Sequence, residues 1–348
     1  MKGRIVVLGQ LRGREAAALI VDGQLVDLIV DPGDAVALAP GAICRAVVDR
    51  QMKGQGGVFV RLPEGRGFLR ETGGLAPGQA ILVQVAAGTE PGKALPVSQR
   101  LLFKSRYAIV TPEAPGLNVS RRIRDDETRA ALAALAADAM AGSAYGLILR
   151  SACEGAEAEV ITDDITAMRA LAEAVLADVA GAPELLVDAP GPQEEAWRDW
   201  ADPAPDDLAD GPEAMHDHGV DEAVDTLLGP RVDLPGGAHM MIEPTRALIA
   251  VDVNTGADTS PAAGLKANIA AARDLPRQLR LRGLGGQVTV DFAPMPKKDR
   301  ATLEQQIRSA FRGEAAETSL AGWTPLGNFE LQRKRDRVAL ATILETTP

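Results

Sequence analysis

Two apolar runs that each end in an acidic residue constrain this chain more than any other feature. Residues 247–256 read Ala-Leu-Ile-Ala-Val-Asp-Val-Asn-Thr-Gly and contain Asp252 and Asn254. Residues 287–292 read Gln-Val-Thr-Val-Asp-Phe and contain Asp291. Each pattern predicts a buried β-strand that carries one carboxylate at or near its C-terminal end.

The segment between these runs predicts a helix. Residues 262–283 place apolar side chains on one side, and Pro276 lies inside the span, so either the helix kinks there or two helices meet. A helix that links two strands makes an αβ layer. We therefore expect Asp252 and Asp291 on one edge of that layer.

Two carboxylates on neighbouring strand ends, with the amide of Asn254 beside one of them, form an oxygen-rich site suited to Mg²⁺. Such an ion keeps bound waters and can present an activated water to a phosphodiester. A simpler interpretation stays open at this point, since an Asp at a strand end is often only a helix cap or a turn former.

Composition indicates a globular protein. The chain has 348 residues, enough for roughly two or three domains, and 46% of them are hydrophobic. We expect a cytoplasmic protein without a membrane segment, because no signal-peptide pattern and no apolar run of about 18 residues is present. Cys44 and Cys153 form no Cys-x-x-Cys pair, and the three His residues (His216, His218, His239) give no zinc pattern.

The formal net charge of −11 argues against indiscriminate nucleic-acid binding. The charge is uneven, however. Residues 273–300 hold seven Lys or Arg against three Asp, and smaller basic clusters lie at 121–124 and 333–337. This local basic track on an acidic body remains compatible with a nucleic-acid ligand.

The N-terminal third predicts β-structure. Residues 1–36 predict an antiparallel meander, with Asp22-Gly23 as a hairpin turn. Residues 37–100 contain about five short strands with Gly-rich turns, which suit a small OB-type barrel. Phe59 and Phe68 are candidate stacking platforms for single-stranded bases on that barrel. The alternative is that either ring simply fills the barrel core.

The middle of the chain mixes strands and helices. We predict helices over 127–140 and 163–179, the second capped by Asp163 or Asp164. Arg150-Ser151 directly follows a predicted strand and is a possible anion pocket, because a guanidinium matches phosphate geometry. Residues 193–230 are rich in Pro, Asp and Glu and predict a linker or a reduced subdomain.

Several stretches resemble the catalytic domain of the ribonuclease E/G family. The longest reads Arg-Gln-Leu-Arg-Leu-Arg-Gly-Leu-Gly-Gly at 277–286, between the Ala-Val-Asp-Val-Asn-Thr run at 250–255 and Val-Asp-Phe at 290–292. Shorter matches are Gly-Phe-Leu at 67–69, Ser-Arg-Arg-Ile at 120–123, Gly-Leu-Ile-Leu-Arg at 146–150 and Leu-Pro-Gly-Gly at 234–237. The resemblance spans nearly the whole chain and is weakest at 185–230.

The resemblance implies a multi-subdomain α+β architecture. An RNase-H-like part is split into residues 1–36 and a reduced, acidic second part or linker at 193–230. An OB-fold RNA-binding barrel (37–100) and a 5′-sensor-like subdomain (101–192) are inserted between them. A DNase-I-like αβ catalytic subdomain follows at 231–348.

The resemblance also implies residue roles. Asp252 and Asp291 would be the Mg²⁺ ligands, and Asn254 would orient the attacked phosphate. Arg150 and Ser151 would hold a 5′-monophosphate. Three further residues would contact single-stranded RNA on the barrel (Phe59, Phe68, Lys93), and Arg333 would touch the substrate near the metal.

Three departures from the family pattern stand out, and the first bears on the expected assembly. The family's zinc-linking Cys-Pro-x-Cys motif is absent, so we expect no zinc-linked tetramer and predict a monomer or weak dimer. Ala293 follows Phe292 where the family usually has an acidic residue, and Pro276 replaces a helix former.

The predicted function is a Mg²⁺-dependent endoribonuclease that cleaves single-stranded RNA in RNA processing or decay, with 5′-monophosphate sensing. One alternative is a catalytically weak or inactive RNA-binding adaptor derived from the family. Another is an unrelated αβ Mg²⁺ enzyme such as a phosphatase, although a small-molecule enzyme has no need of the barrel and its Phe pair.

Overall fold

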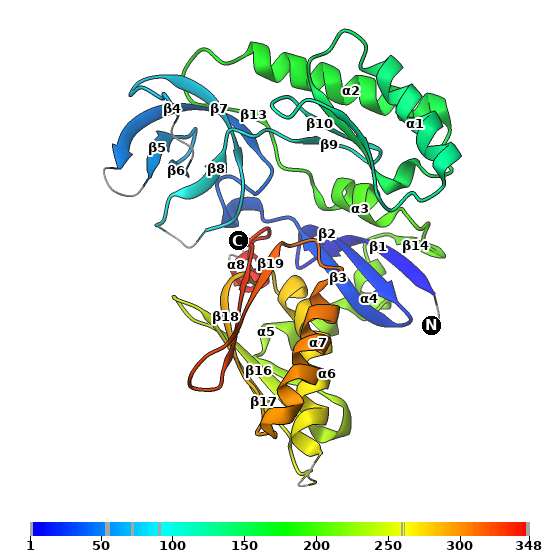
Figure 1. The fold of residues 1–348 in the computed structure, drawn as a ribbon, viewed down its shortest axis with the longest axis vertical. Coiled ribbons are helices and arrows are strands. Elements are labelled where there is room, and N and C mark those ends of the chain that lie inside the picture. Colours follow the sequence, from blue (N-terminus) through cyan, green and yellow to red (C-terminus); the bar gives the residue numbers. More distant parts are fainter. Residues whose placement is uncertain are drawn as a thin grey trace. The chain divides into compact units, whose positions relative to one another are not determined.

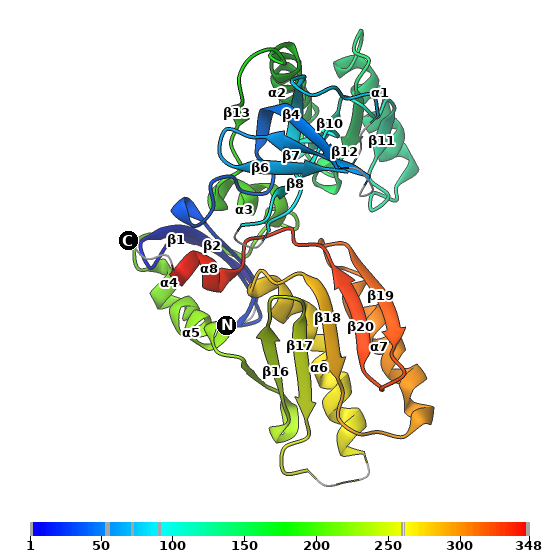
Figure 2. The ribbon, with the colours of Figure 1, turned by 90° about the vertical axis from the view of Figure 1, so that its left-hand side faces the viewer.

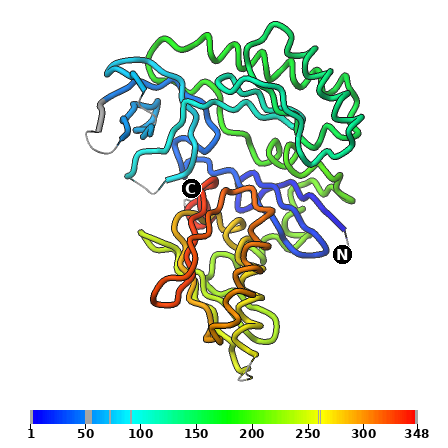
Figure 3. The backbone as a smooth tube through the Cα atoms, in the orientation of Figure 1, coloured from blue at the N-terminus to red at the C-terminus, as the bar shows by residue number. Residues whose placement is uncertain are grey.

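The computed structural model of the chain describes residues 3–52, 56–70, 73–89, 92–258, 260 and 262–345. The fold is mixed α+β and divides into two compact units, residues 1–2, 7–35 and 209–348 in one and residues 3–6 and 36–208 in the other. Figures 1 and 3 trace the chain from its blue N-terminal strands to its red C-terminal end. Each unit is described by itself.

The N-terminal meander is confirmed as three strands, β1 (Arg4–Leu11), β2 (Arg14–Val21) and β3 (Gln24–Val30). Asp22 (φ 50°) and Gly23 (φ 79°) both have positive φ at the β2–β3 turn, as a two-residue hairpin of the right twist requires. A fourth strand from much later in the chain, β14 (Asp207–Asp210), pairs with β1 in the order β14-β1-β2-β3.

A closed five-stranded barrel of OB-like form follows. Its strands are β4 (Ile43–Met52), β5 (Gly57–Arg61), β6 (Arg66–Leu69), β7 (Ala80–Val85) and β8 (Leu95–Ser98). The order β4-β5-β6-β8-β7 closes because β7 pairs back onto β4. Small aliphatic side chains such as Val58, Val60 and Val83 fill the interior. A further strand, β13 (Glu184–Val187), adds to the outer edge of β4.

The next layer is a sheet in the order β11-β12-β10-β9, made of β9 (Phe103–Lys104), β10 (Ala108–Thr111), β11 (Leu117–Val119) and β12 (Gly146–Leu149). Two helices cover it, α1 (Asp126–Ala139) and α2 (Ala158–Ala177). The predicted start of the second helix at Asp163 was wrong. Asp164 lies inside α2, where its carboxylate accepts hydrogen bonds from the Ser105 hydroxyl (2.5 Å) and the Tyr107 amide (3.1 Å) instead of capping the helix.

Of the two alternatives for residues 193–230, a linker or a reduced subdomain, the structure favours the second, because the segment is folded. It contributes most of α3 (Pro192–Trp200), all of β14, and the helices α4 (Ala214–Asp217) and α5 (Val220–Leu228). Apolar residues at helical spacing explain this, since Pro192, Ala196 and Trp200 are the buried residues of α3. High acidity alone was a poor guide because these acids lie on exposed faces.

The C-terminal region is a six-stranded sheet in the order β15-β16-β17-β18-β20-β19. The strands are β15 (Arg231–Asp233), β16 (His239–Pro244), β17 (Ile249–Asn254), β18 (Gly286–Asp291), β19 (Thr318–Trp323) and β20 (Phe329–Arg333). The helices α6 (Ala263–Leu281) and α7 (Arg300–Phe311) lie along one face, and α8 (Leu340–Glu345) follows (Figure 2). Within the described ranges, short 3-10 helices cover Gly33–Ala35, Ser151–Cys153, Pro235–Gly237 and Lys297–Asp299.

Helix α6 runs as one element through the buried Pro276. Its N-terminal half packs closely on the segment that follows β18, where a Cβ on Gly264 would lie 2.1 Å from the Pro294 carbonyl oxygen. Asn268, fully buried, donates to the Ala293 carbonyl and accepts from the Ala293 amide, both at 2.9 Å. These contacts fix the chain directly after Asp291.

Among the helices of the described residues, none combines the length and the apolar character needed to cross a bilayer.

The Asn268 contact predicts a large stability effect. Replacing Asn268 by Ala leaves two buried backbone groups of Ala293 without partners, and we expect a loss of ~3 kcal/mol in the free energy of unfolding. Asn118→Ala, at an exposed strand position, is the matched control and should stay within about 0.5 kcal/mol of the parent. Chemical denaturation measures both. Equal stability of the two variants would contradict this reading of α6.

Candidate functional site

Asp252 and Asp291 face each other across two paired strands. β17 and β18 run parallel, and their register pairs Ile249 with Val288 and Asp252 with Asp291. Adjacent strands lie about 4.8 Å apart, and side chains of paired residues leave the same face of a sheet. Both Asp side chains are exposed. The structure therefore brings the two predicted carboxylates together.

Alternation of residue types produces this arrangement. Ile249, Val251 and Val253 of β17 are buried, as are Val288 and Val290 of β18, and they form one core with α6 and α7. Because successive side chains of a strand point to opposite faces, the intervening Asp252 and the terminal Asp291 project from the other face. The apolar runs thus fix both strand position and carboxylate direction.

Asn254 lies beside the pair. Its side-chain amide donates to Oδ2 of Asp252 at 2.7 Å. This bond holds the carboxylate in one orientation while the amide oxygen of Asn254 stays available as an acceptor. The structure therefore groups all three predicted catalytic residues.

The electrostatics of the pair suit a divalent cation. Like charges directly opposite each other on neighbouring strands are destabilising. Neither Asp252 nor Asp291 forms an ion pair with a described Lys, Arg or His residue. Within the described part of the chain, no group of three or more His, Cys, Asp or Glu residues converges as a metal site. Two carboxylates fit Mg²⁺, which usually keeps several waters and takes few protein ligands.

Three residues of this C-terminal region were not predicted as site residues from the sequence. His239 of β16 is the register partner of Asn254 and lies on the same sheet face, and its Nδ1 is buried without a hydrogen-bond partner among the described residues. Lys297 and Lys298 are exposed in the 3-10 turn soon after β18. Alternation along β16, where Met240 and Ile242 are buried, was the available signal for His239.

The barrel aromatics point outward. Phe59 and Phe68 are register partners on β5 and β6, with ring centroids 5.5 Å apart in an edge-to-face arrangement. Both are partly exposed, whereas their strand neighbours Val58, Val60 and Leu69 fill the interior. The alternative of core filling is therefore wrong for both rings. Lys93 is exposed shortly before β8, whose strand pairs with β6.

Arg150, at the end of β12, is held in a dense network. Its Nη1 donates to the carbonyl oxygens of Ser105 (2.7 Å), Arg198 (3.1 Å) and Arg106 (3.4 Å), and its Nη2 donates to Asp199 at 2.5 Å. Burial by itself would raise the pKa of Asp199. Hydrogen bonds and charge from Arg198, then from Arg150, outweigh burial and lower that pKa. A carboxylate oxygen of Asp199 thus already contacts the Arg150 guanidinium, which is the group predicted to bind phosphate. Ser151 is the next residue in the chain after Arg150.

Arg333 lies in the interior. Only 2% of its side chain is exposed, and its Nη2 is 2.9 Å from Glu314 Oε2, so contact with RNA would require the side chain to leave this pair. Much of the predicted basic track is likewise engaged within its unit. Arg277 binds Asp274, Arg280 binds Glu314 and the Val26 carbonyl, and Arg282 binds the Gly229 carbonyl.

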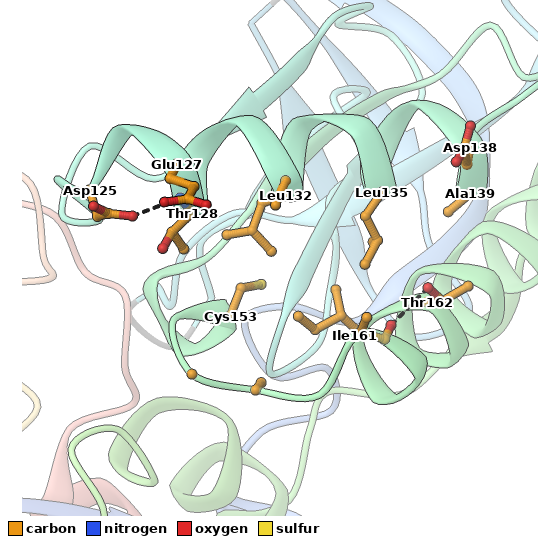
Figure 4. A pocket seen from close by; sticks show the side chains of 14 residues that line it. Asp125, Glu127, Thr128, Leu132, Leu135, Asp138, Ala139, Cys153, Ile161 and Thr162 are labelled. Carbon is orange, nitrogen blue, oxygen red and sulfur yellow. Dashed lines mark hydrogen bonds between the residues drawn. The ribbon is translucent and has the colours of Figure 1, made fainter.

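A separate cavity of about 880 Å³ lies between α1 and α2 (Figure 4). Leu132, Leu135 and Ile161 give it an apolar floor, and acidic residues including Asp125 and Asp138 line it. Cys153 also lines it, and burial raises the pKa of that thiol to about 11, which disfavours the thiolate near neutral pH. The acidic lining does not suit a phosphate.

Comparison with known proteins decides the family. The model of the Ribonuclease E/G family matches residues 103–209 and 206–336, which is more than half of the chain. The chain belongs to the ribonuclease E/G family.

Individual family members cover the chain broadly. It is 29% identical to Ribonuclease E of Nostoc over 96% of its own length, 30% identical to Ribonuclease G of Haemophilus influenzae over 77%, and 29% identical to Ribonuclease G of Escherichia coli K12 over 77%. The alignments cover 56%, 62% and 62% of those relatives, respectively. The chain therefore spans little more than half the length of the family members it matches.

The opposed carboxylates predict a metal-linked change in stability. Asp291→Asn removes one of two facing charges, so without metal we expect a gain of about 0.5 kcal/mol. Mg²⁺ should raise the melting temperature of the parent but not of Asp291→Asn, because only a folded-state site binds it. Thermal scans with Mg²⁺ and with EDTA measure this.

Glu330→Gln is the matched control for this scan. Glu330 is exposed on the neighbouring strand β20 and is paired in register with Thr289 rather than with an acid. The control should respond to Mg²⁺ as the parent does. An equal Mg²⁺ response from Asp291→Asn would argue against a metal at this pair.

Proposed function

We propose that this chain is a Mg²⁺-dependent endoribonuclease that cleaves single-stranded RNA in RNA processing or decay. Family membership supports an endoribonuclease. The observation that carries the proposal for this chain is the register pairing of Asp252 with Asp291 on an exposed sheet face. Neither carboxylate has a described cationic partner, so their proximity is best accounted for by a bound divalent ion.

In this proposal Asp252 and Asp291 hold the ion, and Asn254 orients Asp252 through its 2.7 Å hydrogen bond while directing its amide at the attacked phosphate. Bound Mg²⁺ would polarise a phosphate oxygen and lower the pKa of a water. The buried contact between Asn268 and Ala293 keeps the segment after Asp291 in place. Lys297 and Lys298, in that same region, are the exposed cations we assign to backbone phosphates instead of the buried Arg333.

The barrel supplies the proposed RNA track. Phe59 and Phe68 present partly exposed rings on adjacent strands, and aromatic faces bind successive bases without sequence preference. Lys93 adds a positive charge near the same strands. We assign Arg150 and Ser151 to a 5′-monophosphate, because the Arg150 guanidinium already binds the anionic oxygen of Asp199 at 2.5 Å. A 5′-phosphate would replace that carboxylate.

Loss of either carboxylate should abolish cleavage. With a 5′-monophosphorylated A/U-rich oligonucleotide and Mg²⁺, we expect products that carry a 5′-phosphate and a 3′-hydroxyl, and no reaction in EDTA. Asp252→Asn and Asp291→Asn should each slow cleavage about 10³-fold or more, because each removes stabilisation of several kcal/mol. RNA affinity should change little, and Glu330→Gln should behave as the parent.

The same assay separates the alternatives. Mg²⁺-dependent cleavage by both Asn variants at the parent rate would overturn the metal assignment. Binding of RNA by the parent without any cleavage would favour the adaptor alternative.

The proposed roles of Phe68 and Lys93 predict different effects on the affinity for single-stranded RNA and on its salt dependence. Phe68→Ala should weaken single-stranded RNA binding about tenfold through lost stacking, while the salt dependence of binding keeps its slope. Lys93→Ala should instead reduce that slope by about 0.7, as expected for one phosphate contact to a single strand. Phe68→Tyr keeps the ring and should bind normally. Titrations at several salt concentrations measure these effects, and unchanged affinity of Phe68→Ala would remove Phe68 from the track.

A further inference from the structure

Trp197 is an exposed aromatic residue on a helix that otherwise buries its large side chains. Its side chain is 62% exposed, whereas Trp200, three positions later on α3, is 4% exposed. Aromatic residues make up only 3% of the chain, with three Trp in total. A single exposed apolar residue is normal on a protein surface, so the surroundings of Trp197 must carry the argument.

Arg106 fixes one face of the Trp197 ring. The guanidinium carbon lies 4.2 Å from the Trp197 ring centroid and 5.2 Å from that of Tyr107. Arg106 Nη2 also reaches the Ala201 carbonyl at 3.5 Å, just beyond the end of α3. The ring is therefore held by a cation–π contact on one face while most of its surface stays accessible.

Arg106 and the residues next to Trp197 also bind Arg150. The carbonyl oxygens of Arg106 and Arg198 both accept hydrogen bonds from Arg150 Nη1, at 3.4 and 3.1 Å. Arg198 is the chain neighbour of Trp197, and Asp199, which contacts Arg150 Nη2, follows it. The residues that hold the exposed Trp197 ring and those that bind the Arg150 guanidinium are thus joined through the backbone of Arg106 and Arg198.

Arg150 already binds one anionic group. Carbonyl oxygens engage its Nη1, and among the described residues its anionic partner is the Asp199 carboxylate, which is 38% exposed at its side chain. Asp199 Oδ2 also accepts from Arg198 Nε (3.1 Å) and Nη2 (2.7 Å), so the carboxylate can leave Arg150 while it stays paired with Arg198. The carbonyl contacts would still hold the Arg150 guanidinium in place. The aromatic surface of Trp197 would then lie beside an anchored 5′-phosphate.

We propose that Trp197 is the stacking platform for the base of the 5′-terminal nucleotide of single-stranded RNA, whose phosphate displaces Asp199 from Arg150. This inference rests on the proposed 5′-monophosphate sensing and adds a base-binding subsite to it. Stacking accepts every base, so the subsite recognises a nucleotide end rather than a sequence. Inorganic phosphate alone would be a poor ligand.

A binding cycle tests the subsite. Three versions of one short RNA are used in EDTA, so that no cleavage occurs: 5′-monophosphorylated, 5′-hydroxyl, and 5′-monophosphorylated with the first base removed. Each is titrated against the parent, Trp197→Ala, Trp197→Phe and Leu208→Ala. Leu208 is 57% exposed and lies outside the cluster, so it matches Trp197 as an exposed apolar side chain.

Removing the first base should weaken binding to the parent and to Leu208→Ala about tenfold. Trp197→Ala should bind the complete RNA about tenfold more weakly than the parent does and lose nothing further when the base is absent. Trp197→Phe keeps a ring and should restore most of the base dependence. If Trp197→Ala still loses affinity on base removal, or if the parent is insensitive to it, this inference is overturned alone. If the parent does not distinguish phosphate from hydroxyl, the proposed 5′ sensing fails, and this inference with it.

Discussion

The in-register parallel pairing of β17 with β18 is the constraint on which the candidate site depends. It is created by the α6 crossover, and the other described pairings of that sheet are antiparallel. A shift of one residue would turn Asp291 toward the core and separate it from Asp252. The buried Val pairs on the opposite face oppose such a shift, because each would then become exposed. Core packing therefore sets the distance between two charges that repel each other.

The two facing carboxylates repel each other, and no described Lys, Arg or His side chain pairs with either of them. The basic residues nearby in sequence are largely occupied elsewhere, as with Arg280 and Arg333, which both bind Glu314. These ion pairs leave the exposed sheet face around Asp252 and Asp291 acidic. A divalent cation at this acidic pair would lower the local negative charge, as the proposed function requires.

The sequence predicted the parts of the site that depend on local pattern. The strands around Asp252 and Asp291, the Asp22-Gly23 hairpin and the barrel strands all follow from alternation and turn residues. Stretches whose contacts lie far away in sequence were predicted poorly. Asp164 resembles a cap but binds Ser105 and Tyr107, and the acidic composition of residues 193–230 left both a linker and a reduced subdomain open, although β14 pairs with β1.

The direction in which side chains point was the second feature that the sequence did not predict. Arg333 is basic and close in sequence to the site, yet its position on the inner face of β20 buries it. His239 was set aside as lacking zinc partners, and only the β16–β17 register shows it opposite Asn254. No sequence pattern singles out Trp197, and only the structure shows its contact with Arg106. The assigned subdomain boundaries and the role of each site residue remain predictions.

Direct location of the metal tests the central claim most closely. Crystals of the chain soaked with Mn²⁺, a stand-in for Mg²⁺ that scatters anomalously, should give one strong anomalous peak within coordination distance of a carboxylate oxygen of both Asp252 and Asp291. The peak should vanish in crystals of Asp252→Asn. A peak at another site, with none between these two carboxylates at saturating Mn²⁺, would contradict the account.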